Sequence, residues 1–303
     1  MTSFQIKDIL SHFTECKFVG DENCTLSSVV ALNTLTDEAK QDAITWVSDK
    51  NIAGFDKRIS VGLFILSAAG YEKFKEYPCN FLISQSPRFT FLKLLSLKFS
   101  SQRKPTIENT AVIHPTAKLG NACYIGHHVV IEENVTIGNN VEILHNTVIL
   151  KGTQIGNHVK IGANNTIGNY GFGYEKDEKG EYILVPHIGN VVIENFAEVG
   201  NNTCIDRAVT GSTLIRKNAK IDNLVHIAHG VEIGENSLII ANAVIAGSVV
   251  IGKNVWVAPS ASILNKKKVA DNATVGMGAV VLKDVSANDV VVGNPAKSIK
   301  NLF

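Results

Sequence analysis

The chain has 303 residues, of which 45% are hydrophobic and 19% are charged, and its formal net charge is +1. This composition is typical of a globular protein, and the balanced charge excludes a global electrostatic field for nucleic acid or membrane surfaces. Five scattered cysteines without a CxxC pair favour neither a disulfide framework nor a zinc knuckle. The start is amphipathic rather than signal-like, and no apolar run reaches the roughly 20 residues that span a bilayer. We therefore expect a cytoplasmic protein with no integral membrane segment and no nucleic-acid partner.

Residues 1–104 lack the periodicity that dominates the rest of the chain, and we predict that they form a small α/β domain. Apolar residues at helical spacing between Ile6 and Phe13 predict a short helix. Three short buried strands are predicted, at Ile44–Val47, Val61–Leu66 and Phe81–Ser84. Pro87 then opens an amphipathic helix. The apolar stripe of this helix is formed by Phe91, Leu92, Leu94, Leu95 and Phe99.

From Ile113 to Val281, a large aliphatic residue recurs at every sixth position with few interruptions. A hexapeptide repeat is the signature of a parallel β-helix, in which each hexad supplies a short strand and a corner. Three hexads make one triangular coil, so the series predicts about eight coils. Position 1 of the hexad is expected to point inward, and position 5 is expected to share the interior. The glycines that are common at position 2 are expected to supply permissive backbone dihedrals at the corner.

Two segments interrupt the repeat. Residues 171–187 are rich in glycine and charge, which predicts a loop that leaves the helix wall on the binding face. The four-residue excess between Ile205 and Ile215 predicts a second, smaller loop over residues 209–213. The expected organisation is an N-terminal α/β domain with a possible nucleotide (uridine) site over residues 1–104, a β-helix over 105–285, and a short C-terminal tail over 286–303.

The densest group of candidate catalytic side chains lies in the segment Ile221–Glu232. It places Asp222, Asn223, His226 and His229 on adjacent hexads, at positions that do not point inward. A neutral imidazole is the usual general base near pH 7, and a nearby carboxylate such as Asp222 could orient it. The competing interpretation is that these are exposed corner residues, and the spacing alone leaves both open.

Several segments resemble the UDP-3-O-(3-hydroxyacyl)glucosamine N-acyltransferase family of lipid A synthesis. The resemblance covers roughly residues 105–285, and the GFGY, IDN and IAH motifs are more specific than the hexapeptide repeat. It implies a left-handed parallel β-helix. The flat outer walls of such a solenoid are expected to associate, most simply as a homotrimer. The matching segments are IHPTAKLGN (Ile113–Asn121), IGNYGFGY (Ile167–Tyr174), PHIGNVVI (Pro186–Ile193), TCIDRA (Thr203–Ala208), IDNLVHIAHGVEIG (Ile221–Gly234) and IAGS (Ile245–Ser248).

The resemblance assigns roles to four residues. His229 matches the catalytic histidine of the family, which takes a proton from the substrate amine as that amine attacks an acyl thioester. Gly247 matches the residue whose backbone N–H stabilises the tetrahedral oxyanion. Asp222 and Asn223 match the motif that lines the site beside the histidine. The alternative for Gly247 is a corner glycine that the repeat itself selects.

Two positions near this group depart from the family. His226 stands where the family usually has Gln, and it is expected to contact substrate. The second histidine of the family falls at or next to Lys266, in a lysine run that continues with Lys267. These two lysines are interpreted either as contacts for phosphates of the acyl donor or as a solvated corner.

The remaining substrate contacts are expected from the N-terminal domain and from the predicted loop. The resemblance assigns uracil recognition to an aromatic residue, an Asn and a Tyr, and this chain has Trp46, Asp49 and Ile52 at those positions. Trp46 is expected either to stack on a base or to belong to the core. Phe172 and Tyr174, in the GFGY motif, are expected to contact substrate.

The resemblance implies N-acyl transfer from a thioester donor, either acyl carrier protein or coenzyme A, to the amine of a nucleotide-linked amino sugar. The first choice of acceptor is UDP-3-O-(3-hydroxyacyl)glucosamine in lipid A synthesis. The ending GNPAK resembles that of sugar acetyltransferases, so the alternative is a nucleotide amino-deoxysugar of O-antigen or capsule with a short-chain acyl-CoA. We expect direct transfer with no permanently bound cofactor and no metal.

Two other classes of function remain open from the residues. One is a metal hydratase in which His226 and His229 are zinc ligands. The other is a binding solenoid without catalytic activity, for which the GFGY and IAH motifs would have no purpose.

Overall fold

The computed structural model describes residues 3–34, 40–52, 60–100 and 103–300. The chain divides into two compact units, Met1–Gln102 and Arg103–Phe303. The expected division after residue 104 lies two residues beyond this boundary. In the part of the chain that the structure describes, no helix has the length and apolar character needed to cross a membrane.

The N-terminal unit is built on a five-stranded sheet in which only one edge strand runs antiparallel to its neighbour. In spatial order its strands are β2 (Lys17–Val19), β7 (Phe81–Ile83), β6 (Val61–Leu66), β5 (Lys40–Trp46) and β4 (Ser28–Val29). A separate antiparallel pair joins β1 (Phe4–Gln5) to β3 (Thr25–Leu26). The helices are α1 (Lys7–Leu10), the 3-10 helix η1 (Leu32–Thr34), α2 (Asp49–Ile52), α3 (Ala68–Phe74) and α4 (Pro87–Lys98).

The structure confirms the three predicted strands and the helix that begins at Pro87. All six residues of β6 are buried, as expected for a central parallel strand covered on both faces. The predicted stripe of α4 is wrong at Leu92, which is 49% exposed. Thr90 and Leu94 are the buried residues of this helix, because they lie four positions apart on one face.

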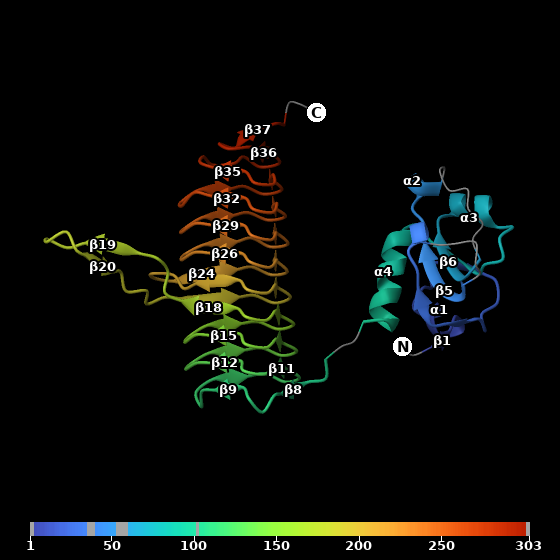
Figure 1. Ribbon diagram of the computed structural model, residues 1–303, viewed down its shortest axis with the longest axis horizontal. Helices are drawn as coiled ribbons and strands as arrows, with labels where there is room; N and C mark the ends of the chain where they lie inside the picture. Colours follow the sequence, from blue (N-terminus) through green and yellow to red (C-terminus); the bar gives the residue numbers. More distant parts are fainter. Residues whose placement is uncertain (1–2, 35–39, 53–59, 101–102, 301–303) are drawn as a thin grey trace. The chain divides into compact units, whose positions relative to one another are not determined.

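The C-terminal unit is a parallel β-helix with three flat walls (Figure 1). The first wall contains β10 (Lys118–Leu119), β13 (Thr136–Ile137), β16 (Gln154–Ile155), β21 (Asn190–Ile193), β24 (Ser212–Ile215), β27 (Glu232–Ile233), β30 (Val250–Ile251) and β33 (Lys268–Val269). The second wall contains β8 (Thr106–Ile107), β11 (Tyr124–Ile125), β14 (Glu142–Ile143), β17 (Lys160–Ile161), β22 (Glu198–Val199), β25 (Lys220–Ile221), β28 (Leu238–Ile239), β31 (Trp256–Val257), β34 (Thr274–Val275), β36 (Val290–Val292) and β37 (Lys297–Ser298). The third wall contains β9 (Val112–Ile113), β12 (Val130–Ile131), β15 (Val148–Ile149), β18 (Thr166–Asn169), β23 (Cys204–Asp206), β26 (His226–Ile227), β29 (Val244–Ile245), β32 (Ser262–Ile263) and β35 (Val280–Val281).

The interior of the β-helix is a set of stacked aliphatic rows. Position-1 residues of successive coils pair directly, as Ile227 does with Ile245 and then Ile245 with Ile263. Position-5 residues such as Val225 and Ala243 are also buried, so both predicted inward positions are confirmed. Each fully buried aliphatic side chain contributes roughly 1.5–3 kcal/mol. The predicted fold class, a mainly β solenoid of hexapeptide coils with a small N-terminal α/β domain, is confirmed.

The β-helix is longer than the repeat predicts at its C-terminal end. Val285 forms a parallel bridge with Val269, and β36 pairs in parallel with β34. The predicted end of the repeat near Val281 is therefore wrong, because part of the expected tail closes a further coil. The third wall alone contains nine strands, one more than the eight coils predicted.

The corner glycines have a different purpose from the predicted one. Glycine is required at position 2 because the backbone of the next coil approaches closely there. A Cβ on Gly138, for example, would lie 2.7 Å from the backbone carbonyl of Gly156. The left-handed conformation occurs instead at position 4, where asparagine is frequent, as at Asn134 and Asn140. Asparagine adopts this conformation more readily than most residues. The predicted link between position-2 glycine and permissive dihedrals is therefore wrong at most corners, although it holds at Gly168, whose φ is 91°.

The two predicted interruptions differ in outcome. Residues 171–187 contain an antiparallel hairpin, β19 (Tyr174–Lys176) and β20 (Tyr182–Leu184), that projects away from the stacked coils (Figure 1). The predicted C-terminal boundary of the smaller loop is wrong, because Ser212 and Thr213 belong to β24 and pair with Asn190 and Val191. Thr213 is fully buried in an inward row.

The contrast between positions 2 and 4 predicts opposite responses to substitution. Gly138→Ala should destabilise the β-helix by roughly 2 kcal/mol, because the added methyl group overlaps backbone that cannot move independently. Gly152→Asn, at position 4, should change stability by less than about 1 kcal/mol, because its φ of 71° suits asparagine and no atom lies within 4 Å of the added Cβ. Chemical denaturation midpoints of the two variants measure the difference, and equal midpoints would contradict the packing explanation.

Candidate active site

One corner of the β-helix, after the strands of the third wall, forms a pocket of about 380 Å³. The strands β23, β26, β29 and β32 are successive neighbours in this wall. The residues that follow them therefore stack at intervals of about 4.8 Å along the helix axis. The pocket is lined by Phe172, Asp206, His226, Ala228, His229, Val244, Ala246, Gly247, Ser248, Asn265 and Lys266.

His229 and Gly247 face each other across neighbouring coils in this pocket. The amide of Ser248 donates to the carbonyl of His229 at 2.9 Å, which fixes the two corners relative to each other. A Cβ at position 247 would lie 2.7 Å from Nε2 of His229. Only glycine leaves that nitrogen unobstructed, so the structure explains why glycine stands at this position.

The Gly247 N–H is one of the corner amides that have no protein acceptor. At some equivalent positions the amide donates to a side chain of a neighbouring coil, as from Asn201 to Asn223 Oδ1 at 2.7 Å and from Lys253 to Asp271 Oδ1 at 2.8 Å. The Gly247 amide donates to no acceptor within the described part of the chain. Asn265, the equivalent residue one coil further on, lines the pocket instead. A free N–H beside an imidazole nitrogen is the arrangement that stabilises an oxyanion next to a general base.

His229 is held by the base of the hairpin segment. The His187 ring is perpendicular to the His229 ring, with centroids 5.4 Å apart. Gly171 fills the space beside both, since a Cβ there would lie 2.9 Å from Cδ2 of His229 and 3.0 Å from Nε2 of His187. Burial, and then the neighbouring His187, lower the pKa of His229 below 6.5. The imidazole is therefore neutral at pH 7, as a general base requires.

His187 itself is almost completely buried, with 2% of its surface exposed. Its Nδ1 lies 2.6 Å from the carbonyl oxygen of Val185, so Nδ1 carries a proton and donates it to that oxygen. Its Nε2 has no hydrogen-bond partner in the described residues.

Asp206 and His226 occupy the part of the pocket nearest the N-terminal coils. Oδ2 of Asp206 lies 3.7 Å from Nε2 of His226. Burial raises the pKa of Asp206 to about 7, and burial lowers the pKa of His226. Both shifts favour the uncharged forms, so the two side chains are not a stable ion pair at neutral pH.

The hairpin segment and the lysine run contribute one pocket residue each. Phe172 lines the pocket and is 89% exposed. Tyr174 packs edge-on against Phe172 with ring centroids 5.0 Å apart, but it does not line the pocket. Lys266 lines the pocket, whereas Lys267 does not. Of the two predicted donor-binding lysines, the structure brings only Lys266 to this corner.

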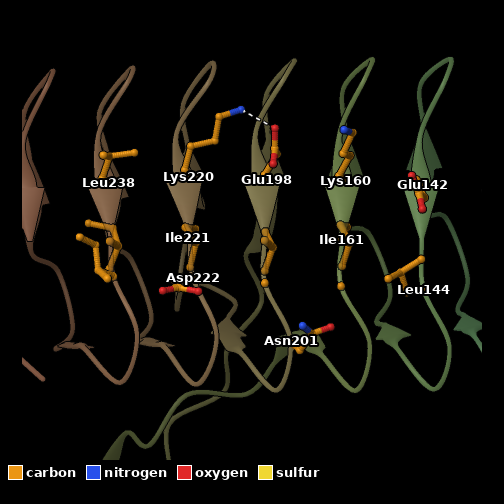
Figure 2. A pocket seen from close by; sticks show the side chains of 15 residues that line it. Glu142, Leu144, Lys160, Ile161, Glu198, Asn201, Lys220, Ile221, Asp222 and Leu238 are labelled. Atoms are coloured by element: carbon orange, nitrogen blue, oxygen red, sulfur yellow. Dashed lines mark hydrogen bonds and ion pairs between the residues drawn. The ribbon is translucent and has the colours of Figure 1, made fainter. Parts of the chain in front are cut away.

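Asp222 and Asn223 lie on a different corner of the same chain. They follow β25 of the second wall, where Asp222 lines a separate pocket of about 470 Å³ with Glu142, Lys160 and Lys220 (Figure 2). One carboxylate oxygen of Asp222 accepts from the Asn223 amide at 2.7 Å, and the other accepts from Ala241 at 3.2 Å. The prediction that Asp222 orients His229 is therefore wrong within one chain, because adjacent hexads face different walls.

Trp46 and Asp49 line a pocket of about 510 Å³ within the N-terminal unit. The Trp46 ring stacks on Phe91 with centroids 6.1 Å apart, and it packs partly against the hydrophobic core. Its other neighbours in the pocket include Arg88 and Phe89. Trp46 thus belongs to the edge of the core and to the wall of a pocket at once.

Three pocket or pocket-flanking residues were not predicted: Asp206, His187 and Asn265. Asp206 and His187 lie in the TCIDRA and PHIGNVVI segments that carried the resemblance, so the sequence contained a signal for both. Asn265 had no distinct signal, since corner asparagines are frequent in this repeat.

For the hypothesis of a zinc site, the described residues of a single chain provide no set of ligands. Among the residues that the structure describes, no group of three or more His, Cys, Asp or Glu side chains is arranged to hold a metal ion. His226 and His229 share the pocket, but only with Asp206 and Lys266 as further titratable groups.

Comparisons with known proteins agree with this geometry. Family models match residues 107–171 (GMPPB C-terminal domain) and residues 212–247 (bacterial transferase hexapeptide, six repeats). A UDP-3-O-acylglucosamine N-acyltransferase from Christiangramia forsetii is 56% identical over 81 residues, which is 27% of this chain and 24% of that protein. The enzyme of that name from Campylobacter lari is 37% identical over 300 residues, which is 94% of this chain and 91% of that protein.

The structure also resembles a solved acyltransferase. A UDP-N-acetylglucosamine acyltransferase from Campylobacter jejuni superposes with a TM-score of 0.59 at 26% identity. The match covers 64% of this chain and 73% of that one. The segment shared with the C. forsetii relative spans about a quarter of that relative, whereas the C. lari relative is matched over nearly its whole length.

The environment of His229 predicts its titration behaviour. Its pKa should lie below the ordinary value of 6.5, because burial and the neighbouring His187 both disfavour the imidazolium form. His187→Gln keeps a polar side chain of similar size and removes the second cause, so the pKa of His229 should move back upward. Proton NMR titration of the histidine resonances measures both values. A His229 pKa above 6.5 in the unaltered protein would contradict this account of the pocket.

Proposed function

Because the chain belongs to the UDP-3-O-acylglucosamine N-acyltransferase family, we propose that it transfers an acyl group from a thioester to the amine of a nucleotide-linked amino sugar at the His229 corner. The observation that carries this proposal is the pairing of His229 Nε2 with a free Gly247 N–H in one pocket. Together they supply a base and an oxyanion donor, which are the two groups that acyl transfer requires.

The reaction proceeds in this proposal by direct attack. The neutral amine attacks the thioester carbonyl carbon, and His229 Nε2 accepts a proton from the amine nitrogen as the C–N bond forms. The Gly247 N–H donates to the carbonyl oxygen as it becomes an oxyanion. The C–S bond then breaks, and His229 returns the proton to the sulfur. No step requires a covalent enzyme intermediate, a bound cofactor or a metal.

The acceptor proposed first is UDP-3-O-(3-hydroxyacyl)glucosamine, for lipid A synthesis. The near-complete coverage of the C. lari relative supports it, since that protein is named for this acceptor class. Lys266, at the pocket edge, is assigned to phosphate groups of the donor, which is acyl carrier protein or coenzyme A. The N-terminal pocket with Trp46 and Asp49 is assigned to the nucleotide, because an aromatic face beside polar side chains suits a base.

We further propose a homotrimer in the cytoplasm. Hydrophobic side chains on the outer faces of the walls are well exposed in a single chain, including Trp256 at 46% and Val244 at 42%. Flat apolar walls of this kind are suited to association by rotational symmetry. Cys16, Cys24, Cys123 and Cys204 are free thiols in the described chain, which suits a reducing compartment.

Removal of the base tests the mechanism. His229→Ala should lower turnover by roughly 10²–10⁴ in an assay of thioester consumption, because general base catalysis contributes about that factor. The melting temperature should stay within a few degrees of that of the unaltered protein, because the His229 side chain lies outside the inward rows. An unchanged rate would remove His229 from the mechanism.

Gly247→Ala tests the pairing independently of the base. The added methyl group displaces the His229 ring, and a misplacement of about 1 Å costs roughly 10²-fold in rate. The backbone at Gly247 is not left-handed, so the stability of the β-helix should be nearly unchanged. The control is Gly152→Asn, which lies at the same corner three coils before His229 but does not line the pocket, and it should keep full activity. Equal activity of the Gly247→Ala and control variants would contradict the proposed geometry.

A further inference from the structure

A largely buried carboxyl group without a protein hydrogen-bond donor lies in the pocket beside the proposed base. The Asp206 side chain keeps 11% exposure, so its carboxyl group meets solvent only through the pocket. No donor among the described residues reaches its oxygens, and the nearest titratable group is His226, whose Nε2 lies 3.7 Å from Oδ2. A carboxylate with so little water and no protein donor points to a ligand in the pocket that supplies one.

The charged side chains that surround Asp206 do not neutralise it. Arg207, next in sequence, is turned toward the preceding coils and donates to the carbonyls of Gly168 and Lys151 at 2.5 and 2.9 Å. Cys204 lies in the same strand, β23, and its pKa is raised by burial and then by Asp206 itself. The strand after it presents His226 and His229, which burial keeps neutral. Lys266 lines the pocket from three coils further on, and the preceding strand, β18, carries no titratable side chain.

The position of Asp206 places it close to the reacting groups. Ile205 pairs with Ile227 in the next coil, so the residue after each, Asp206 and Ala228, are also neighbours. His229 follows Ala228 directly at the corner. Asp206, His229 and Gly247 therefore lie on three consecutive coils and line one pocket, with His229 in the middle.

An amine acceptor poses a chemical problem that a hydroxyl acceptor does not. A hydroxyl group loses one proton when it is acylated. An amine that arrives as an ammonium ion must lose two, one before it can attack and one as the amide forms. His229 accounts for only one of these protons in each cycle, because it must return that proton to the leaving sulfur.

We propose that Asp206 binds the amino group of the acceptor and takes the first of these protons, leaving the second to His229. The proposal rests on the function proposed above and adds the residue that makes the pocket selective for an amine. The first step is R–NH₃⁺ with Asp206 carboxylate giving R–NH₂ and neutral Asp206. The neutral amine then forms the C–N bond, its second proton passes to His229 Nε2, the C–S bond breaks, and the thiolate receives that proton. Asp206 returns its proton to solvent when the product leaves.

The acidity of Asp206 suits this step. Burial raises its pKa to about 7, whereas an ordinary aspartate has a pKa of about 3.9. An amine with electron-withdrawing neighbours, such as an α-amino group, has a pKa of about 7.7–8.0. Proton transfer to Asp206 is therefore uphill by about one pKa unit, compared with about four for an ordinary aspartate. The bound ammonium also supplies the donors that the buried carboxylate lacks.

Binding and kinetics of the full chain test this inference together. Calorimetry at pH 7 would compare UDP-glucosamine with UDP-glucose, which differ in one amino group, for the unaltered protein, Asp206→Asn and Asp206→Ser. The unaltered protein should bind the amine at least about tenfold more tightly, and both variants should lose that preference. The matched control is Glu235→Gln, an exposed carboxylate at a remote corner, which should retain it.

The pH dependence separates a proton acceptor from a structural residue. Asp206→Asn should lower kcat/KM for the amine acceptor by about 10² at pH 7, and the deficit should shrink below about tenfold at pH 9, where the amine is already neutral. A pH-independent loss, an unchanged profile, or equal or absent binding of the two probes to the unaltered protein would overturn the inference. If the unaltered protein prefers the amine through Asp206 but acylates no acceptor, the proposed function fails and the amine site stands.

Discussion

The distance between neighbouring coils is the constraint on which the rest of the β-helix depends. Strands of one wall stack at about 4.8 Å, so every residue lies directly over its equivalent in the adjacent coils. This spacing makes the inward rows continuous, excludes a Cβ where the backbone of the next coil approaches Gly138, and requires a left-handed residue at position 4 of nearly every corner. It also lines up side chains that are far apart in sequence. Asp206, His229 and Gly247 reach one pocket by this stacking alone.

The proposed active site joins a corner of this regular stack to the segment that interrupts the repeat. Some corners satisfy an amide with the side chain of a neighbouring coil, as Asn201 does with Asn223. The Gly247 amide has no acceptor in the described residues, and an added Cβ at this position would lie 2.7 Å from Nε2 of His229. The hairpin segment adds Gly171 and His187, which hold that ring and keep it neutral. At this corner a stable scaffold thus brings together an amide without an acceptor, a neutral imidazole and a carboxyl group without a protein donor, which a substrate can satisfy.

The periodic part of the fold could be predicted from the sequence, whereas the grouping of the site could not. Inward rows follow from hydrophobic spacing, because burial acts on every coil in the same way. The reason for glycine at position 2 could not be predicted, because close approach of two backbones and a need for unusual dihedrals both select glycine. Asp222 appeared to be a partner of His229 because seven residues separate them, yet adjacent hexads lie on different walls. Asp206 was missed for the opposite reason, since its proximity to His229 arises from the stacking of successive coils.

The most direct test of the account is a crystal structure of the protein with UDP-glucosamine bound. The account predicts the amino nitrogen within hydrogen-bonding distance of both His229 Nε2 and a carboxyl oxygen of Asp206, with the Gly247 N–H directed at the space beside it. An amino nitrogen bound beyond hydrogen-bonding distance of every His229 in the crystal would contradict it.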